Sequence, residues 1–389
     1  MKRTPHWQRK AIAFLLAGLL LLAVPGFNRT ASAAAPVCGS GDHGLLPELQ
    51  VKNAASGATM AFSDIEFLNA DTGRAAGNGF MIGTSDGGCQ FQKIYEGQWN
   101  FRDIDFPNNV HGWALASVQD GQQVYLIATA DGGATWKRLG SGAVTFERID
   151  FLDNTHGFGY NRASTYYTAD GGVTWTRVAT PANTRGAEFT SRQNGWAVVV
   201  QPGASYKVMK TANGGKSWSL SLTASFAYPE FGRVYASGKQ VYALLYGGTG
   251  MSQTSYSLYA SANQGKTWTR VIAESTAGGG PAPGSGALQH DKGPAKGKPG
   301  NMQLVGDASA FLVGYSPAGG EVAVGRSLNA GKTWTNLPPV PGYEGIISFP
   351  DSTKGWMAVR GLNGEAILYA TSDGGSSWQA KLTFKGNSR

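Results

Sequence analysis

Hydrophobic and polar positions alternate along much of this chain, in short segments that each lead into a polar turn. Five segments pass from an alternating stretch through Phe and a turn to a Gly that precedes Trp, Phe or Arg: DIEFLNADTGR (64–74), DIDFPNNVHGW (103–113), RIDFLDNTHGF (148–158), AEFTSRQNGW (187–196) and IISFPDSTKGW (346–356). Alternation with period two is typical of a β-strand that buries one face. No amphipathic helix pattern appears after residue 33, so the chain is predicted to be all-β.

A second phrase, Thr/Ser-x-Asp/Asn-x-Gly-x-Thr/Ser-Trp, recurs along the chain. It occurs seven times, at 84–91, 129–136, 168–175, 211–218, 261–268, 327–334 and 371–378, and the first copy ends in Gln-Phe. Asp and Asn accept hydrogen bonds from nearby backbone N–H groups, and Gly adopts a positive φ without steric cost. Each copy is therefore predicted to be a hairpin turn covered by its Trp. The structural residues of these turns are Asp86, Asp131, Asp170, Asn213, Asn263, Asn329, Asp373, Trp136, Trp175, Trp218, Trp268, Trp334 and Trp378.

Together the two phrases predict one propeller blade per repeat. Each unit holds four short strands in about 40–50 residues, which is the size of a blade. Seven copies predict a seven-bladed β-propeller over 63–384, with one such hairpin in every blade. The Gly- and Pro-rich stretch at 276–300 predicts a flexible insertion in this ring.

Two segments are candidates for the strand that completes the last blade. Residues 49–53 belong to an N-terminal segment at 34–62, and residues 378–384 precede a tail at 385–389. Both resemble the final strand of a repeat, so the sequence leaves the choice open.

The start of the chain has the three parts of a secretory signal peptide. A basic beginning precedes an apolar run at 11–24, and Ala-Ser-Ala follows at 31–33. The run is shorter than the about 20 residues that a membrane-spanning helix needs. We therefore expect cleavage after residue 33, no stable membrane span, and a secreted or extracytoplasmic protein of the cell envelope. In such a compartment cysteines pair, which predicts a Cys38–Cys89 disulfide.

Charge and motif spacing exclude several partners and cofactors. The chain has 33 basic and 25 acidic residues, but five of the basic residues and none of the acids lie in the first 33 positions. The remainder is close to neutral, so no nucleic-acid partner is expected. Two Cys without a His cluster predict no metal site. The Gly-x-Gly-x-x-Gly match at 39–44 follows no strand, so no cofactor is predicted.

The turn phrase resembles the Asp-box, or bacterial neuraminidase repeat. The combined repeat is similar to that of the photosystem II stability/assembly factor family and its relatives in non-photosynthetic bacteria, in which Ile-x-Phe and Gly-Trp precede Thr-x-Asp-Gly-Gly-x-Thr-Trp. The resemblance covers about 63–380. It implies a β-propeller that binds a protein partner. Asp-boxes also occur in sialidases and other glycoside hydrolases, so the resemblance is more specific for fold than for function.

Acidic and basic residues of the predicted first strands are the candidate binding residues. Glu66, Asp105, Asp150 and Glu188 each precede the Phe of their strand, and they are expected to form a column around the axis. Such a column is either a hydrated structural channel or a funnel that binds a cation or amine. The basic candidates, from three consecutive repeats, are Arg102, Arg148 and Arg185.

These residues define two functional hypotheses. The first is a monomeric, non-catalytic protein-binding or assembly module of the cell envelope, with no catalytic residue. The alternative is a glycan-binding or sialidase- or glycoside hydrolase-like cell-surface protein. That alternative requires converging arginines with a Tyr–Glu pair, or two carboxylates that face each other across a cleft.

Overall fold

The computed structural model describes residues 38–49, 60–118, 121–250, 252–285, 288–290 and 292–385. The predicted signal segment and the residues after 385 lie outside these ranges. Val37–Arg389 is one compact unit. Its described part consists of β-strands, one short helix α1 (Leu45–Glu48) and a 3-10 helix η2 (Pro294–Lys296). No helix within the described ranges is long and apolar enough to cross a membrane.

The strands form six sheets that follow one another in chain order. The first sheet contains β1 (Phe62–Phe67), β2 (Gly73–Thr84), β3 (Gln92–Asp105), β4 (Gly112–Val118), β5 (Val124–Thr129) and β6 (Lys137–Arg138). The second contains β7 (Arg148–Phe151), β8 (Gly157–Tyr160), β9 (Thr165–Thr168) and β10 (Thr176–Val178). The third contains β11 (Thr184–Phe189), β12 (Gly195–Gln201), β13 (Ser205–Thr211) and β14 (Ser219–Ser225).

The remaining three sheets complete the unit. The fourth contains β15 (Gly232–Ser237), β16 (Gln240–Gly250), β17 (Gln253–Ser261), β18 (Thr269–Glu274) and β19 (Leu288–His290). The fifth contains β20 (Lys298–Val305), β21 (Ser309–Ser316), β22 (Glu321–Ser327), β23 (Thr335–Asn336) and β24 (Val340–Pro341). The sixth contains β25 (Glu344–Ser348), β26 (Gly355–Arg360), β27 (Ala366–Thr371) and β28 (Gln379–Phe384).

The propeller therefore has six blades, and the prediction of seven blades is wrong. The difference arises at β3, which is 14 residues long. Its first part pairs with β2 up to Asn100, and its last part pairs with β4 from Trp99 onward. Because the chain stays extended there, the first two sequence repeats share one six-stranded sheet.

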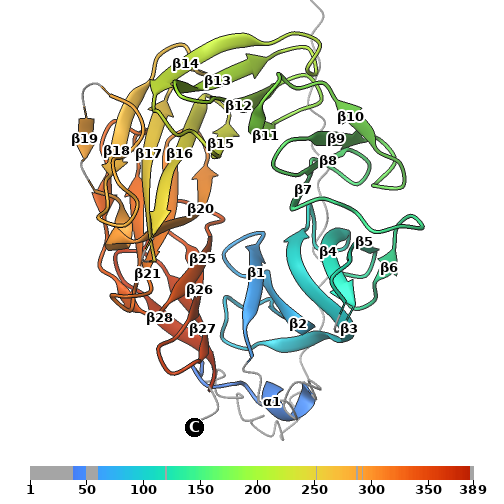
Figure 1. The fold of residues 1–389 in the computed structure, drawn as a ribbon. Helices are drawn as coiled ribbons and strands as arrows, with labels where there is room; N and C mark the ends of the chain where they lie inside the picture. The colour runs from blue at the N-terminus through green and yellow to red at the C-terminus, as the bar shows by residue number, and fades with distance from the viewer. Residues whose placement is uncertain are drawn as a thin grey trace, which may run out of the picture. The chain divides into compact units, whose positions relative to one another are not determined.

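The six sheets close into a ring through contacts between neighbours. The first strands β7, β11, β15, β20 and β25 each contact the preceding sheet, and β1 contacts β25 and β26 of the last sheet. Figure 1 shows this closure, with the blue strand β1 beside the red strands of the sixth sheet. The strand β28 completes the last sheet, whereas Leu49 follows α1 and residues 50–53 lie outside the described ranges.

The repeated phrase forms the same hydrogen-bonded turn at all seven positions. At 129–136, the Thr129 hydroxyl donates to Asp131 (2.7 Å) and accepts from the Gly133 N–H (3.0 Å), while the Thr135 N–H donates to Asp131 (2.9 Å). The two backbone bonds recur in every copy. Gly132 and Gly133 have φ values of 76° and 103°, which L side chains rarely adopt.

The second strand of these repeats begins with Gly, and the side chain of the residue after that Gly contacts the turn of the next repeat. Arg74 donates to the Gly132 carbonyl (3.0 Å), and the Trp113 indole donates to the Gly171 carbonyl (2.8 Å). At the closure of the ring, Trp356 lies against Gly88 of the first turn and stacks on Phe67, with ring centroids 4.0 Å apart. The Gly-Trp phrase is thus a contact between repeats.

An N-terminal segment holds the last sheet to the first. The Cys38–Cys89 disulfide, which the sequence predicts, is formed. The Thr383 N–H of β28 donates to the Gly41 carbonyl (3.0 Å), and Lys93 of β3 donates to the Glu48 carbonyl (3.1 Å). Residues 38–49 therefore bridge the two sheets between which the ring closes.

The sequence predicts a flexible insertion at 276–300, whereas the described parts of this segment are bonded to the fourth sheet. The Ser255 hydroxyl donates to the Gly279 carbonyl (2.9 Å), and the Gly293 N–H donates to Glu274 (2.8 Å). The strand β19 pairs in parallel with β18. The strand β19 thus extends the fourth sheet, while η2 contacts β21 and β22 and residues 298–300 begin β20 of the fifth sheet.

Removal of the Trp356 indole should destabilise the contact between the last and the first sheet of the propeller. Trp356 is 2% exposed, so Trp356→Ala should lower the free energy of unfolding by about 3–5 kcal/mol. Chemical denaturation measures this change. Trp218→Ala, at a half-buried turn position away from the closure, is the matched control and should cost less. Equal stability of the Trp356 variant and the parent would contradict the closure role.

Candidate functional site

The first strands of the six sheets surround a cavity of about 620 Å³, the axial cavity. Alternation along β1 buries Ile65 and Phe67 between sheets and leaves Glu66 at the cavity. Each of the other sheets also contributes a polar side chain. The polar residues of the first strands are Glu66, Asp150, Glu188, Tyr235, Ser237, Gln303 and Ser348, and Thr190 follows β11.

The acidic side chains on the inner strands of the first two repeats bind the backbone of the next inner strand. Asp64 accepts from the Ile104 N–H (2.9 Å) and Glu66 from the Phe106 N–H (2.8 Å). One repeat later, Asp103 accepts from the Ile149 N–H (2.8 Å) and Asp105 from the Phe151 N–H. These four carboxyl groups therefore connect neighbouring inner strands.

Neutral side chains make the same connection elsewhere in the ring. Asn301 accepts from the Ile347 N–H (3.0 Å), and Gln303 accepts from the Phe349 N–H. The Ser348 hydroxyl accepts from the Phe67 N–H (2.9 Å) across the closure, and the Tyr160 hydroxyl accepts from the Phe189 N–H (3.0 Å). Carboxylate, amide and hydroxyl oxygens thus all act as acceptors for N–H groups of the next inner strand.

Asp150 and Glu188 differ from the other axial carboxyl groups. Within the described ranges, neither accepts a hydrogen bond from a backbone N–H. Glu188 accepts from the Arg148 guanidinium (2.7 Å), which also donates to the Ala187 carbonyl (3.1 Å) and lies over the Tyr160 ring (4.1 Å). The Glu188 side chain is 15% exposed. Asp150 and Glu188 therefore face the axial cavity without binding a backbone N–H, while Arg148 joins β7 to β11.

Burial sets the protonation of the axial acids. Burial raises the pKa of Glu188 to about 7, although Arg148 opposes this shift. Burial also raises the pKa of Asp150, again against Arg148. A carboxyl group that holds its proton near neutral pH is suited to general acid catalysis. A second carboxyl group on the same cavity is what a glycoside hydrolase adds as base or nucleophile.

The structure places only some of the predicted site residues together. Glu66, Asp150 and Glu188 line the axial cavity, and Asp105 lies close enough to Asp150 for that charge to raise its pKa. Arg148 lies beside Glu188.

Two of the predicted arginines lie elsewhere. Arg102 is exposed on β3, and the half-buried Arg185 donates to the Thr184 carbonyl. The predicted set Arg102, Arg148 and Arg185 therefore does not converge.

A different set of arginines meets at a narrower cavity of about 60 Å³, whose charged and tyrosine side chains are Glu147, Arg148, Tyr160, Arg162, Glu188, Arg233 and Tyr235. Sequence reasoning missed Arg162 and Arg233. Arg233 lies on β15, whose repeat lacks the Phe and Gly-Trp phrase. Asp64 and Asp103 were also missed, although each stands two positions before a predicted acid, on the same strand face.

Among the described residues, no three His, Cys, Asp or Glu side chains lie close enough together to hold a metal ion.

Comparisons with known proteins include enzymes. No family model matches the chain. A xyloglucanase from Paenibacillus sp is 29% identical over 149 residues, which are 35% of this chain and 13% of that enzyme. The chain therefore spans 13% of the length of this curated relative.

Solved structures share the fold. The GH74 xyloglucanase from Xanthomonas campestris has a TM-score of 0.55 at 13% identity, over 84% of this chain and 55% of that chain. YCF48 bound to D1 peptide has a TM-score of 0.48 at 17% identity, over 77% of this chain and 88% of that chain. The likeness to the Xanthomonas campestris structure supports a β-propeller fold. The prediction of a protein without catalytic activity is corrected, because the curated relative that the chain matches is a xyloglucanase.

The half-buried axial acids Asp64 and Asp103 predict that stability falls as pH rises. Burial, with Asp103 nearby, raises the pKa of Asp64 to about 8, and burial raises that of Asp103 to about 6. Between their unfolded and folded pKa values such acids bind more protons in the folded state. Their contribution to the free energy of unfolding is therefore present at low pH and is lost as pH rises through the folded pKa. The free energy of unfolding should drop by at least about 2 kcal/mol between pH 5 and pH 9.

Denaturant titrations at several pH values measure this slope. Asp64→Asn keeps an oxygen acceptor for Ile104 and removes the charge, so it should flatten the profile. A parent profile that rises from pH 5 to pH 9 would contradict the burial of ionisable acids on the axis.

Proposed function

We propose that this chain is a glycoside hydrolase-like β-propeller that acts on a neutral polysaccharide in the axial cavity. The observation that carries the proposal is the pair Asp150 and Glu188, which face a cavity of about 620 Å³ and bind no backbone N–H within the described ranges. The xyloglucanase match makes xyloglucan the first substrate to test.

The two acids take different roles because their surroundings differ. Glu188, with a pKa of about 7, donates its proton to the glycosidic oxygen as that bond breaks. Asp150 acts as the base that activates water or as the nucleophile, which are the two uses of a second carboxylate. Arg148 holds Glu188 at 2.7 Å and remains charged, since Glu188 and other acids raise its pKa against the effect of burial.

A location outside the cytoplasm agrees with such a substrate. The Cys38–Cys89 disulfide is typical of proteins in oxidising compartments. Together with the predicted signal peptide, it supports a chain that is exported to the cell envelope or secreted.

Hydrolysis of xyloglucan by the full mature chain tests the proposal. Release of reducing ends should be measurable for the parent and should fall at least about 100-fold in Glu188→Gln and Asp150→Asn, because each removes an acid–base group. The parent rate should decline as pH rises through about 7, where Glu188 loses its proton.

Glu48→Gln, an exposed change on α1, serves as the control and should keep the parental rate. Parental rates in both axial variants, or no release from xyloglucan and other β-glucans by the parent, would overturn the proposal. In that case the protein-binding module of the cell envelope, which the sequence predicts first, becomes the better account.

A further inference from the structure

A second pocket lies where the last sheet meets the first. This seam pocket, of about 480 Å³, is lined by Phe62 of β1, by residues of β25, β26 and β27, and by Tyr315 of β21. Glu344 and Ser348 share one face of β25 and stand four residues apart, which is about 13 Å along a strand. Because Ser348 lines the axial cavity, the seam pocket lies toward the opposite end of the inner strands.

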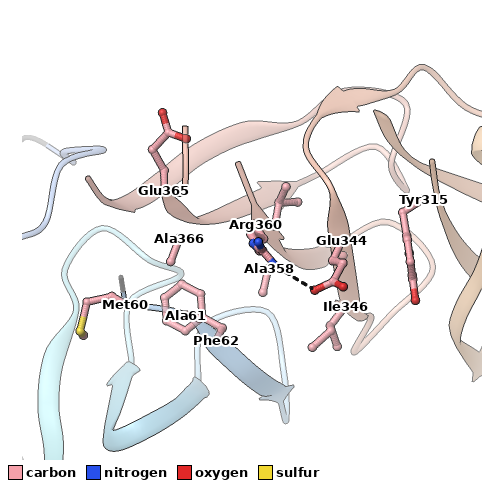
Figure 2. Close-up of a pocket in the computed structure, with 13 residues that line it drawn as sticks. Met60, Ala61, Phe62, Tyr315, Glu344, Ile346, Ala358, Arg360, Glu365 and Ala366 are labelled. Carbon is pink, nitrogen blue, oxygen red and sulfur yellow. Dashed lines mark ion pairs between the residues drawn. The ribbon is translucent and has the colours of Figure 1, made fainter. Parts of the chain in front are cut away.

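Three charged residues, Glu344, Arg360 and Glu365, are among those that line this pocket. Glu344 and Arg360 are cross-strand partners whose charged atoms lie 3.9 Å apart. In Figure 2 this ion pair lies between Phe62 on one side and Tyr315 on the other. Ile346, Ala358 and Val359 line the apolar part of the pocket.

The polar groups are available to a ligand at little cost to the fold. Glu344 and Arg360 are 60% and 61% exposed, and such a surface pair contributes little to stability. Glu365 is held in place differently: its two oxygens accept from the Asn363 N–H (2.9 Å) and the Asn363 side-chain amide (3.0 Å). These bonds lower the pKa of Glu365, so its carboxylate is ionised and oriented at neutral pH.

This combination selects for a particular ligand chemistry. An aromatic ring and an apolar wall suit the flat faces of sugar rings, while carboxylates and a guanidinium bind hydroxyl groups from the sides. Two carboxylates against one guanidinium leave an excess negative charge, which disfavours acidic sugars and phosphate. The volume falls within the range of about 300–1,000 Å³ that small-ligand sites occupy.

We propose that the seam pocket is a second carbohydrate-binding site, which holds a neutral polysaccharide chain away from the axial acids. The substrate class rests on the proposed function, but binding at the seam does not require hydrolysis. The pocket anchors the polymer through Tyr315, Arg360 and Glu365.

Calorimetric titration with a xyloglucan oligosaccharide tests this proposal. Arg360→Gln and Glu365→Gln should each weaken binding at the seam at least tenfold, and Tyr315→Ala should do the same with an unchanged circular dichroism spectrum. The exposed Glu321→Gln on β22, outside the pocket, is the matched control and should bind like the parent. Glu188→Gln should lose hydrolysis and keep this binding.

The outcomes separate the two proposals. Parental affinity in all three seam variants, or no binding of neutral oligosaccharide by the parent, overturns the seam site. Tight binding that the seam variants lose, in a parent that hydrolyses nothing, overturns the proposed hydrolysis and supports the seam site. Tighter binding of an acidic oligosaccharide than of a neutral one contradicts the charge argument.

Discussion

The ring depends on hydrogen bonds that side chains on the axis make to the backbone of the next inner strand. An inner strand has no hydrogen-bonded strand on its axial side, so its buried N–H groups need partners from elsewhere. Asp64, Glu66, Asp103 and Asp105 provide them in the first part of the ring, and Gln303 and Ser348 near its closure. Each bond joins two sheets that share no strand, or two repeats within the first sheet.

A second set of contacts joins the sheets at the repeated turns. The side chain of a second strand reaches the turn of the following repeat, as Trp113 does at Gly171 and Trp356 does at Gly88. The axial bonds and these turn contacts lie at different distances from the axis. Both kinds of contact join the second sheet to the first and the first sheet to the last.

The sequence allowed the β-propeller and the turn chemistry to be predicted, because each repeat carries its own strand alternation and turn residues. The number of blades was not predictable from counting turns, since β3 continues without a break between two repeats. The special position of Asp150 and Glu188 was also hidden. They occupy the same repeat position as Glu66 and Asp105, and only the partners of each carboxyl group distinguish a structural acid from a free one. Arg233 was missed because its repeat has diverged from the pattern.

The proposed function rests on the difference, among the described residues, between axial acids that accept a backbone N–H and the two, Asp150 and Glu188, that do not. Most axial acceptors hold the ring together, whereas Asp150 and Glu188 accept no backbone N–H within the described ranges, and Glu188 pairs with Arg148. A repeat architecture can thus supply reactive groups where it relaxes a structural bond. The sequence match to a xyloglucanase agrees with the proposed function.

Amide hydrogen exchange tests most directly whether Asp105 is a structural acceptor and Asp150 is not. Asp105→Ala removes the acceptor of the Phe151 N–H, and exchange of that amide should accelerate at least tenfold relative to the parent. Asp150→Ala removes no such acceptor, so the amides of the next inner strand, β11, should exchange at parental rates. Equal protection of Phe151 in parent and Asp105→Ala, or loss of protection along β11 in Asp150→Ala, would contradict the account.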